Sequence, residues 1–197
     1  VTPNLLIITH PDFKVEAERL AAHRSGYSQW TTTVVTTEQI YNELSGGRQD
    51  VTALRDLAKN LYDKSPSTLK AILLFGKSSY DYKDIIINNT NFVPTYQSRN
   101  SLHPLLTYAS DDYFTFLEDS EGSWNESPVE HHTLDVGVGR LPVTSLDEAR
   151  TVVDKIIDYD TNQKTLGSWR KKVVFIADDG NSEDNFTSLH QYQADQL

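Results

Sequence analysis

Short apolar runs typical of buried strands alternate with amphipathic helical patterns along most of this 197-residue chain. Strands of a parallel sheet are buried on both faces and therefore form nearly continuous apolar runs, whereas a helix repeats its apolar residues every three or four positions. A strand that alternates with a helix in this way constrains the chain to a mostly parallel sheet. The strand-like runs are residues 4–9, 31–36, 70–76, 134–139 and 173–177.

Helical patterns fill the spaces between these runs. Phe13, Ala17 and Leu20 begin the first helical stripe, and two further helices, 38–44 and 51–62, are separated by the breaker Gly46-Gly47. Ser145 and Glu148 are spaced as a capping box before another apolar stripe, and a last helix is expected to open at Leu189. The pattern predicts one α/β domain over residues 1–197, with a three-layer arrangement of a mostly parallel sheet and flanking helices.

Two segments depart from the alternation. Residues 77–106 form a connection too long for a simple turn, and a connection of that length in a compact domain usually has a function or folds in its own right. Residues 113–117 are apolar and short, so we expect them to pair with a neighbour as a short antiparallel strand.

Composition excludes several classes of function. The net charge is −10, and the 18 basic residues are scattered among 28 acidic ones, which argues against a nucleic-acid partner because phosphate binding needs clustered Lys and Arg. No apolar stretch in this segment is long enough to span a membrane. The chain contains no cysteine, so it forms no disulfide, holds no metal through a thiolate and carries no thiol nucleophile.

Polar residues follow the predicted strands, where an α/β sheet usually binds its ligands. The long connection adds Tyr80, and the adjacent acids Asp111 and Asp112 follow it. A partly buried guanidinium needs an anionic partner, so we predict that Arg140 pairs with Asp111 or Asp112. Five residues are interpreted as structural or as part of the rim of a cleft: Lys77, Tyr80, Asp111, Asp112 and Arg140. The residues at the strand ends are His10, Lys77, Ser78, Arg140, Asp178 and Asp179.

Motifs for specific chemistry are incomplete. Gly76-Lys-Ser78 lacks the first glycine of a phosphate-binding loop, and Tyr80 replaces the second glycine of a nucleophile elbow. His131 and His132 are adjacent, so their side chains diverge and no zinc pattern results. No organic cofactor is expected. One acidic stretch is a candidate calcium site, although it lacks the glycine and glutamate of an EF-hand loop. Its candidate ligands are Asp178, Asp179, Asn181 and Glu183.

An ordered set of segments resembles the gingipain-like cysteine peptidases, and most closely the PorU-type sortases of the bacterial type IX secretion system. The resemblance covers the chain from about Asn4 to its end. Its most specific part comprises Leu73-Leu-Phe-Gly-Lys-Ser-Ser-Tyr-Asp-Tyr82, Phe92-Val-Pro-Thr-Tyr-Gln-Ser98, Ala109-Ser-Asp-Asp-Tyr-Phe114, Asp135-Val-Gly-Val-Gly-Arg-Leu-Pro142, Val152-Val-Asp-Lys-Ile-Ile-Asp-Tyr159, Gly167-Ser-Trp-Arg and Val174-Phe-Ile-Ala-Asp-Asp179.

The resemblance implies a caspase-like fold of two side-by-side subdomains, with the catalytic Cys and His in the second. This chain resembles the first subdomain, so the second catalytic subdomain is expected after residue 197 of the same polypeptide. The family's role further implies polypeptide substrates and a place in the bacterial cell envelope or on the extracellular surface. The histidines of this chain lie outside the Gly-His-Gly turn that carries the family's catalytic histidine, so no catalytic residue is assigned. They are His10, His23, His103, His131, His132 and His190.

Three classes of function follow. The first is a cysteine endopeptidase or sortase that acts on secreted proteins and whose catalytic pair lies outside this chain. The second is a non-catalytic binding or scaffold module built on the same subdomain. The third is a magnesium-dependent receiver-like domain, which would need an acidic pair after the first strand, where this chain has Thr9-His10-Pro11.

Overall fold

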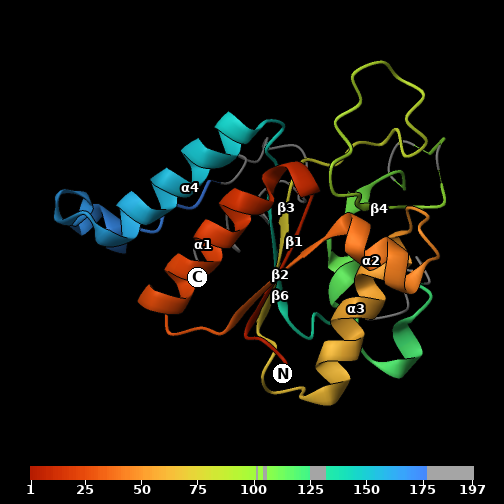
Figure 1. The fold of residues 1–197 in the computed structure, drawn as a ribbon, viewed down its shortest axis with the longest axis horizontal. Coiled ribbons are helices and arrows are strands. Elements are labelled where there is room, and N and C mark those ends of the chain that lie inside the picture. The colour runs from red at the N-terminus through yellow and green to blue at the C-terminus, as the bar shows by residue number, and fades with distance from the viewer. Residues whose placement is uncertain (101, 104–105, 125–131, 177–197) are drawn as a thin grey trace, which may run out of the picture. The chain divides into compact units, whose positions relative to one another are not determined.

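Four parallel strands form the main sheet of the described part of the chain, in the order β2-β1-β3-β6 (Figure 1). The structure is a computed structural model that describes residues 1–100, 102–103, 106–124 and 132–176. It divides into two compact units, Val1–Asp160 and Thr161–Leu197, and the sheet belongs to the first. The strands are β1 (Leu5–Thr9), β2 (Thr32–Thr36), β3 (Ala71–Phe75) and β6 (Gly137–Leu141).

Helices cover both faces of this sheet, which confirms the predicted three-layer α/β architecture (Figure 1). The connection from β1 to β2 runs in one direction along the sheet and the connection from β2 to β3 in the other. Since such crossovers are right-handed, their helices must lie on opposite faces. Helices α1 and α4 accordingly cover one face, and α2 and α3 the other. Their bounds are α1 Lys14–Tyr27, α2 Thr37–Leu44, α3 Val51–Lys64 and α4 Leu146–Thr161.

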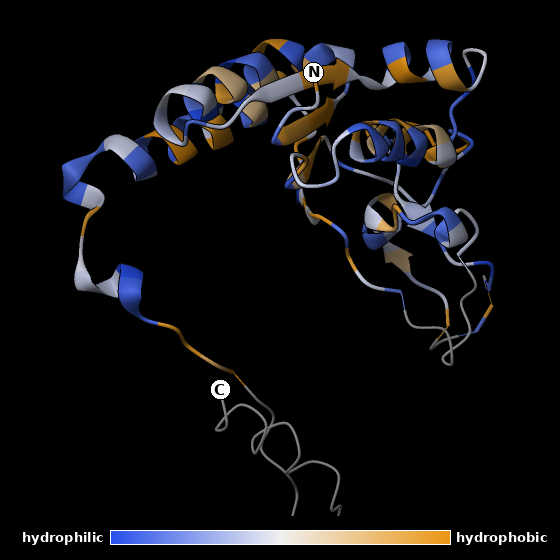
Figure 2. Cartoon of the chain, turned by 90° about the horizontal axis from the view of Figure 1, so that it is seen from below, coloured by the Kyte–Doolittle hydropathy of each residue, from blue (hydrophilic) through white to orange (hydrophobic). Residues whose placement is uncertain are grey.

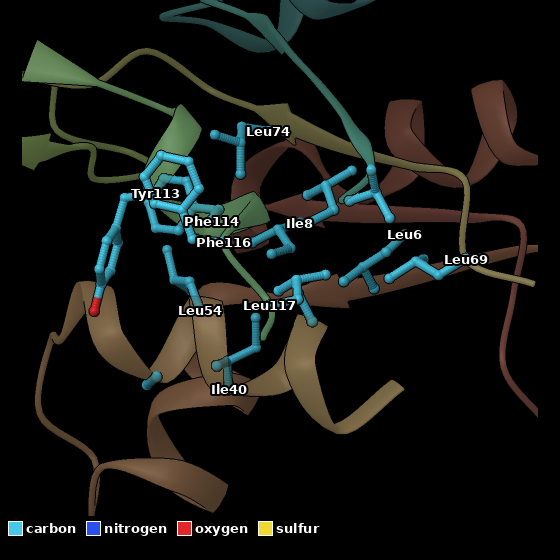
Figure 3. Packing of buried hydrophobic residues seen from close by; sticks show 14 of the residues in the cluster. Leu6, Ile8, Ile40, Leu54, Leu69, Leu74, Tyr113, Phe114, Phe116 and Leu117 are labelled. Atoms are coloured by element: carbon cyan, nitrogen blue, oxygen red, sulfur yellow. The ribbon is translucent and has the colours of Figure 1, made fainter. Parts of the chain in front are cut away.

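The two faces of β1 supply two separate cores, because successive side chains of a strand point to opposite sides. Leu5 and Ile7 pack with Ala17 of α1, Val153 of α4 and Phe13, which directly precedes α1. On the other face, Leu6 and Ile8 meet side chains from α2, α3 and residues 113–117, as Figure 3 shows. In Figure 2 the central strands are largely apolar, whereas the helices carry both apolar and polar residues.

Side-chain caps fix the starts of the helices. Thr36 and Gln39 form a reciprocal capping box at the start of α2. At α4 the Ser145 hydroxyl accepts from the Glu148 amide as predicted, but the Glu148 carboxylate accepts from the amide and hydroxyl of Thr144, at 2.7 Å each. In a standard capping box the Glu148 carboxylate would accept from the amide of Ser145, whereas here it accepts from Thr144, one residue earlier.

The predicted strand at 113–117 is wrong. Asp112–Thr115 is a short 3-10 helix, and five consecutive side chains from Tyr113 to Leu117 are buried against the sheet. A strand with one solvent face would bury alternate residues, whereas the tight turn brings the consecutive residues of this run into the core. The antiparallel pair of this region is instead formed by β4 (Tyr96–Gln97) and β5 (Ala109–Ser110).

Two further strands differ from the sequence prediction. The strand predicted at 134–139 is displaced to Gly137–Leu141, because Asp135 bonds the backbone of Thr115 and Leu117 before the ladder begins. Of the strand predicted at 173–177, Val173 to Ile176 have exposed side chains and no strand partner within the described residues. Residue 177 and the helix expected from Leu189 lie outside the described residues.

Candidate functional site

Arg140 joins the sheet to a loop at its carboxyl edge. It belongs to β6 and stands opposite Leu74 of β3. Its guanidinium forms a bidentate pair with Asp111, in which Nε donates to Oδ2 at 2.8 Å and Nη2 donates to Oδ1 at 2.7 Å. The side chains of Arg140 and Asp111 are 12% and 23% exposed. The ion pair predicted for Arg140 therefore forms, and its partner is Asp111.

The remaining guanidinium donors bind backbone carbonyls. Nη1 donates to the oxygens of Gly76 and Val93, both at 2.7 Å, and Nη2 also donates to the oxygen of Pro94 at 3.2 Å. Because a guanidinium has five N–H donors, each of them has an acceptor here. Asp111 Oδ1 in turn accepts from the Thr95 hydroxyl at 2.8 Å. We refer to Arg140, Asp111, Thr95 and these three carbonyls as the arginine lock.

Gly76 makes the arginine lock sterically possible. Its φ is +148°, and a Cβ at this position would lie 2.9 Å from Val93 Cγ2 and 3.1 Å from Phe92 Cβ. The amides of Phe92 and Val93 bond the Lys77 carbonyl at 2.9 and 3.2 Å, which holds this segment against the end of β3. A glycine directly after a strand could have indicated this close approach. The carbonyls of Val93 and Pro94 have no equivalent signal in the sequence.

The other predicted rim residues lie outside the arginine lock. Asp112 is exposed and starts the 3-10 helix, where its amide donates to the Ser110 hydroxyl at 3.1 Å. Lys77 is exposed and contributes backbone bonds, including an amide donated to the Val143 carbonyl. Tyr80 is 78% exposed. The structure therefore brings together only Arg140 and Asp111, and the role of the five residues as the rim of a cleft stays a prediction.

His10 follows β1 and is held by structural contacts. Its Nδ1 accepts from the Asp12 amide at 3.3 Å, and its ring packs edge-on against Phe92, with centroids 5.1 Å apart. Burial lowers the pKa of His10 below its ordinary value, while the nearby carboxylates of Asp12 and Glu38 act in the opposite direction. The His10 ring is therefore neutral at neutral pH. The amide of Asp12 at Nδ1 favours the tautomer protonated at Nε2, and Asp12 Oδ2 also lies 3.4 Å from Nδ1.

The metal prediction falls on a part of the chain outside the described residues, where Asp178, Asp179, Asn181 and Glu183 lie. Within the described residues, no three His, Asp or Glu side chains are grouped so that they could hold a metal ion. The helices of this part include none that is long and apolar enough to cross a membrane.

The chemistry of the arginine lock is positional. Every donor of the guanidinium is used, and both carboxylate oxygens of Asp111 accept from it. Such a pair offers neither a proton acceptor nor a nucleophile to a substrate. Its effect is to fix the backbone of two loops at the carboxyl ends of β3 and β6, the edge at which α/β proteins place their sites.

This combination defines a class of protein: an open, parallel α/β domain with a braced carboxyl edge. The family model described as "Peptidase family C25" matches residues 1–197, and the chain therefore belongs to this family, the gingipain family. No match was found among curated protein sequences.

Two solved structures extend the comparison. The dimeric latent form of PorU from Porphyromonas gingivalis is 32% identical, with a TM-score of 0.72 over 87% of this chain. A complex of the pro- and mature domains of RgpB from the same organism is 17% identical, with a TM-score of 0.54 over 81% of this chain, and shows the fold alone. The match to PorU confirms the caspase-like fold. The chain corresponds to 17% of the PorU chain and 29% of the RgpB chain.

Proposed function

We propose that this chain is the first, non-catalytic subdomain of a gingipain-like cysteine endopeptidase or sortase. The observation that carries the proposal is a match to a cysteine peptidase family over residues 1–197 of a sequence without cysteine. In a cysteine–histidine mechanism the histidine favours the thiolate and protonates the leaving amine, so a chain without the thiol has no route to this hydrolysis. The catalytic pair would lie on a second subdomain of the same polypeptide.

In this proposal the chain supports the cleft in which peptide bonds are cut or exchanged. The arginine lock would hold the loops at the carboxyl edge of the sheet in the geometry that the cleft requires. Asp111 and Arg140 would act through the loops that they hold, and Asp112, Lys77 and Tyr80, which face solvent, would lie along the rim. The substrates would be secreted proteins, processed by a type IX secretion sortase at the cell envelope or outer surface.

The surface that would meet the second subdomain lies beside β6. Among the described residues β6 pairs only with β3, so one edge of β6 is open. On the α1 and α4 face, Gly137 and Gly139 lack side chains, and an apolar groove of about 670 Å3 lies over them between Leu20, Trp30 and Ile156. An open strand edge beside an apolar groove is typical of a surface that another domain covers.

The proposal is tested with two polypeptides, the 197-residue chain and a longer one that includes the residues following it. We expect the short chain to leave peptide substrates intact and to take no label from a thiol-directed active-site probe. The longer polypeptide should take the label and cleave, and replacement of its labelled cysteine by alanine should abolish both effects. Cleavage by the purified short chain that depends on one of its own histidines would contradict the proposal.

The second candidate is a non-catalytic binding or scaffold module. The same labelling experiment distinguishes this module from a peptidase. If the residues that follow contain no Cys and His pair, neither the short nor the longer polypeptide will take the label. That result would favour a binding role for the whole protein.

A further inference from the structure

A polar hollow of about 300 Å3 lies at the carboxyl edge of the sheet, lined by residues that follow β1, β2 and β3 and by none of the arginine lock. The helix that follows β1 covers one face of the sheet and the connection that follows β3 packs on the other, so this edge lies at a topological switch point, where α/β sheets bind ligands. An adjoining hollow of about 220 Å3 shares part of its lining and adds Asp84. The residues used below are His10, Glu38, Asn42, Gln49, Asn91 and Phe92.

Hydrogen bonds between the loops hold this hollow in shape. The side-chain amide of Gln49 donates to the backbone carbonyl of Tyr82 at 2.9 Å. The Tyr82 hydroxyl donates in return to the backbone carbonyl of Gln49 at 2.6 Å. Asn91 donates to the Gln49 side-chain oxygen at 3.4 Å and accepts from the Ser79 amide at 3.1 Å. Each of these two side-chain amides therefore uses one of its two N–H donors and keeps the other.

Several lining groups make no hydrogen bond within the described residues. They are the buried Tyr41 hydroxyl, the His10 Nε2, the carboxylates of Glu38 and Asp84, and the Asn42 side-chain amide. The neutral His10 ring presents Nε2–H as a donor, the two carboxylates are acceptors, and an amide is both. Donors and acceptors are therefore interspersed around the hollow, beside the half-buried ring of Phe92.

This interspersed lining selects among classes of ligand. An ammonium group only donates and would leave the N–H groups of His10 and the amides unused, whereas a phosphate or carboxylate would be repelled by Glu38 and Asp84. A sugar hydroxyl both donates and accepts, and the C–H face of a pyranose ring suits the negative face of an aromatic ring. A volume of about 300 Å3 is at the lower limit for ligand pockets, which suits a single sugar ring.

We propose that this hollow binds one pyranose unit of a glycan. The inference goes beyond the proposed peptidase role and does not depend on it, because every residue that carries it belongs to this chain. Glu38 would accept hydrogen bonds from sugar hydroxyls, His10 and the amides would donate to them, and Phe92 would contact the ring.

The test is an NMR titration of the 197-residue chain with methyl glucopyranoside, methyl galactopyranoside, methyl mannopyranoside and N-acetylglucosamine. We expect at least one saccharide to shift the resonances of His10 and of the Gln49 and Asn91 side-chain amides, with a dissociation constant of about 1 mM or weaker. The exposed Glu38 can be changed without disturbing the core, so the Glu38→Gln variant should bind the same saccharide about tenfold more weakly, as expected for the loss of a charged acceptor.

Glu43→Gln is the matched control, because Glu43 is an exposed residue of the same helix outside the hollow, and it should bind as the parent does. Butylammonium chloride and inorganic phosphate are the competing probes. The inference is overturned if no saccharide shifts these resonances, if butylammonium or phosphate shifts them while the saccharides do not, or if the two variants bind the saccharide equally.

Discussion

At the residue scale, Arg140 is the best-connected side chain of the carboxyl edge. Its guanidinium makes two bonds to Asp111 and three to backbone carbonyls while it is largely buried. Loss of the guanidinium leaves a partly buried carboxylate and three carbonyls with fewer partners, and the cost arises mainly from those groups.

We expect Arg140→Gln to lower the free energy of unfolding by about 3 kcal/mol. The measurement is urea unfolding at neutral pH, with Arg48→Gln as control because Arg48 is exposed and outside the lock. A double-mutant cycle with Asp111→Asn should give a coupling free energy above about 1 kcal/mol. An Arg140→Gln variant that unfolds at the urea concentration of the parent would show that the lock does not stabilise the fold.

Gly76 provides a second prediction at this scale. Gly76→Ala should destabilise the chain by about 2 kcal/mol, because the new Cβ meets Val93 and φ is +148°. Gly139→Ala is the matched control, since a Cβ there meets nothing within 4 Å and its φ is not in the restricted range. Thermal unfolding of the two variants distinguishes them, and equal melting temperatures would refute the steric argument.

At the element scale, the start of α4 should depend on pH. The backbone and side-chain hydrogen bonds from Thr144 hold the pKa of the Glu148 carboxyl below its usual value. A lowered folded-state pKa contributes stability that is fully present above the unfolded-state pKa of about 4.3 and is lost as pH falls through the folded-state value.

Glu148→Gln should therefore be less stable than the parent at pH 6, and this difference should shrink as the pH is lowered below about 4. Urea unfolding of both proteins across this range measures the effect, and Glu43→Gln controls for the loss of a general surface charge. If the stability difference between the two proteins did not change with pH, the ionised Glu148 carboxylate would not be the group that stabilises the start of α4.

Sequence reasoning at this scale succeeded where one periodicity was unambiguous. The helix predicted at 51–62 forms as α3 and buries Leu54 and Ala58, and the apolar runs at 4–9 and 70–76 form the parallel strands β1 and β3. The run at 113–117 failed because five apolar or β-branched residues suit a strand and a buried tight turn equally. For the candidate site, charge complementarity predicted that Arg140 pairs with Asp111 or Asp112, and the structure shows Asp111 as the partner. The acceptors at Val93 and Pro94 are backbone atoms that any residue would supply.

At the scale of the whole molecule, a second subdomain would explain two features: the edge of β6 that has no strand partner among the described residues, and the apolar groove beside it. Exposed apolar surface of this kind is usually covered in a complete protein. Because burial of such surface stabilises both partners, a polypeptide extended through the next subdomain should melt at a higher temperature than the 197-residue chain.

Calorimetry of the two polypeptides measures this difference. Hydrogen exchange at the β6 amides is the more specific readout, because protection there should rise in the longer polypeptide while protection in β1, which is already central, should not change. A longer polypeptide with the same melting temperature and the same exchange at β6 would favour a self-sufficient domain.

The acceptors of the arginine lock also bear on the kinetics of folding. Arg140 bonds residues 64, 47, 46 and 29 positions away, so the complete arginine lock requires β3 and β6 to be paired and the long connection to be closed. Contacts completed this late have low φ-values, and their loss accelerates unfolding while refolding keeps its rate. The arginine lock would thus determine how long the assembled edge of the sheet persists, rather than how quickly the chain reaches it.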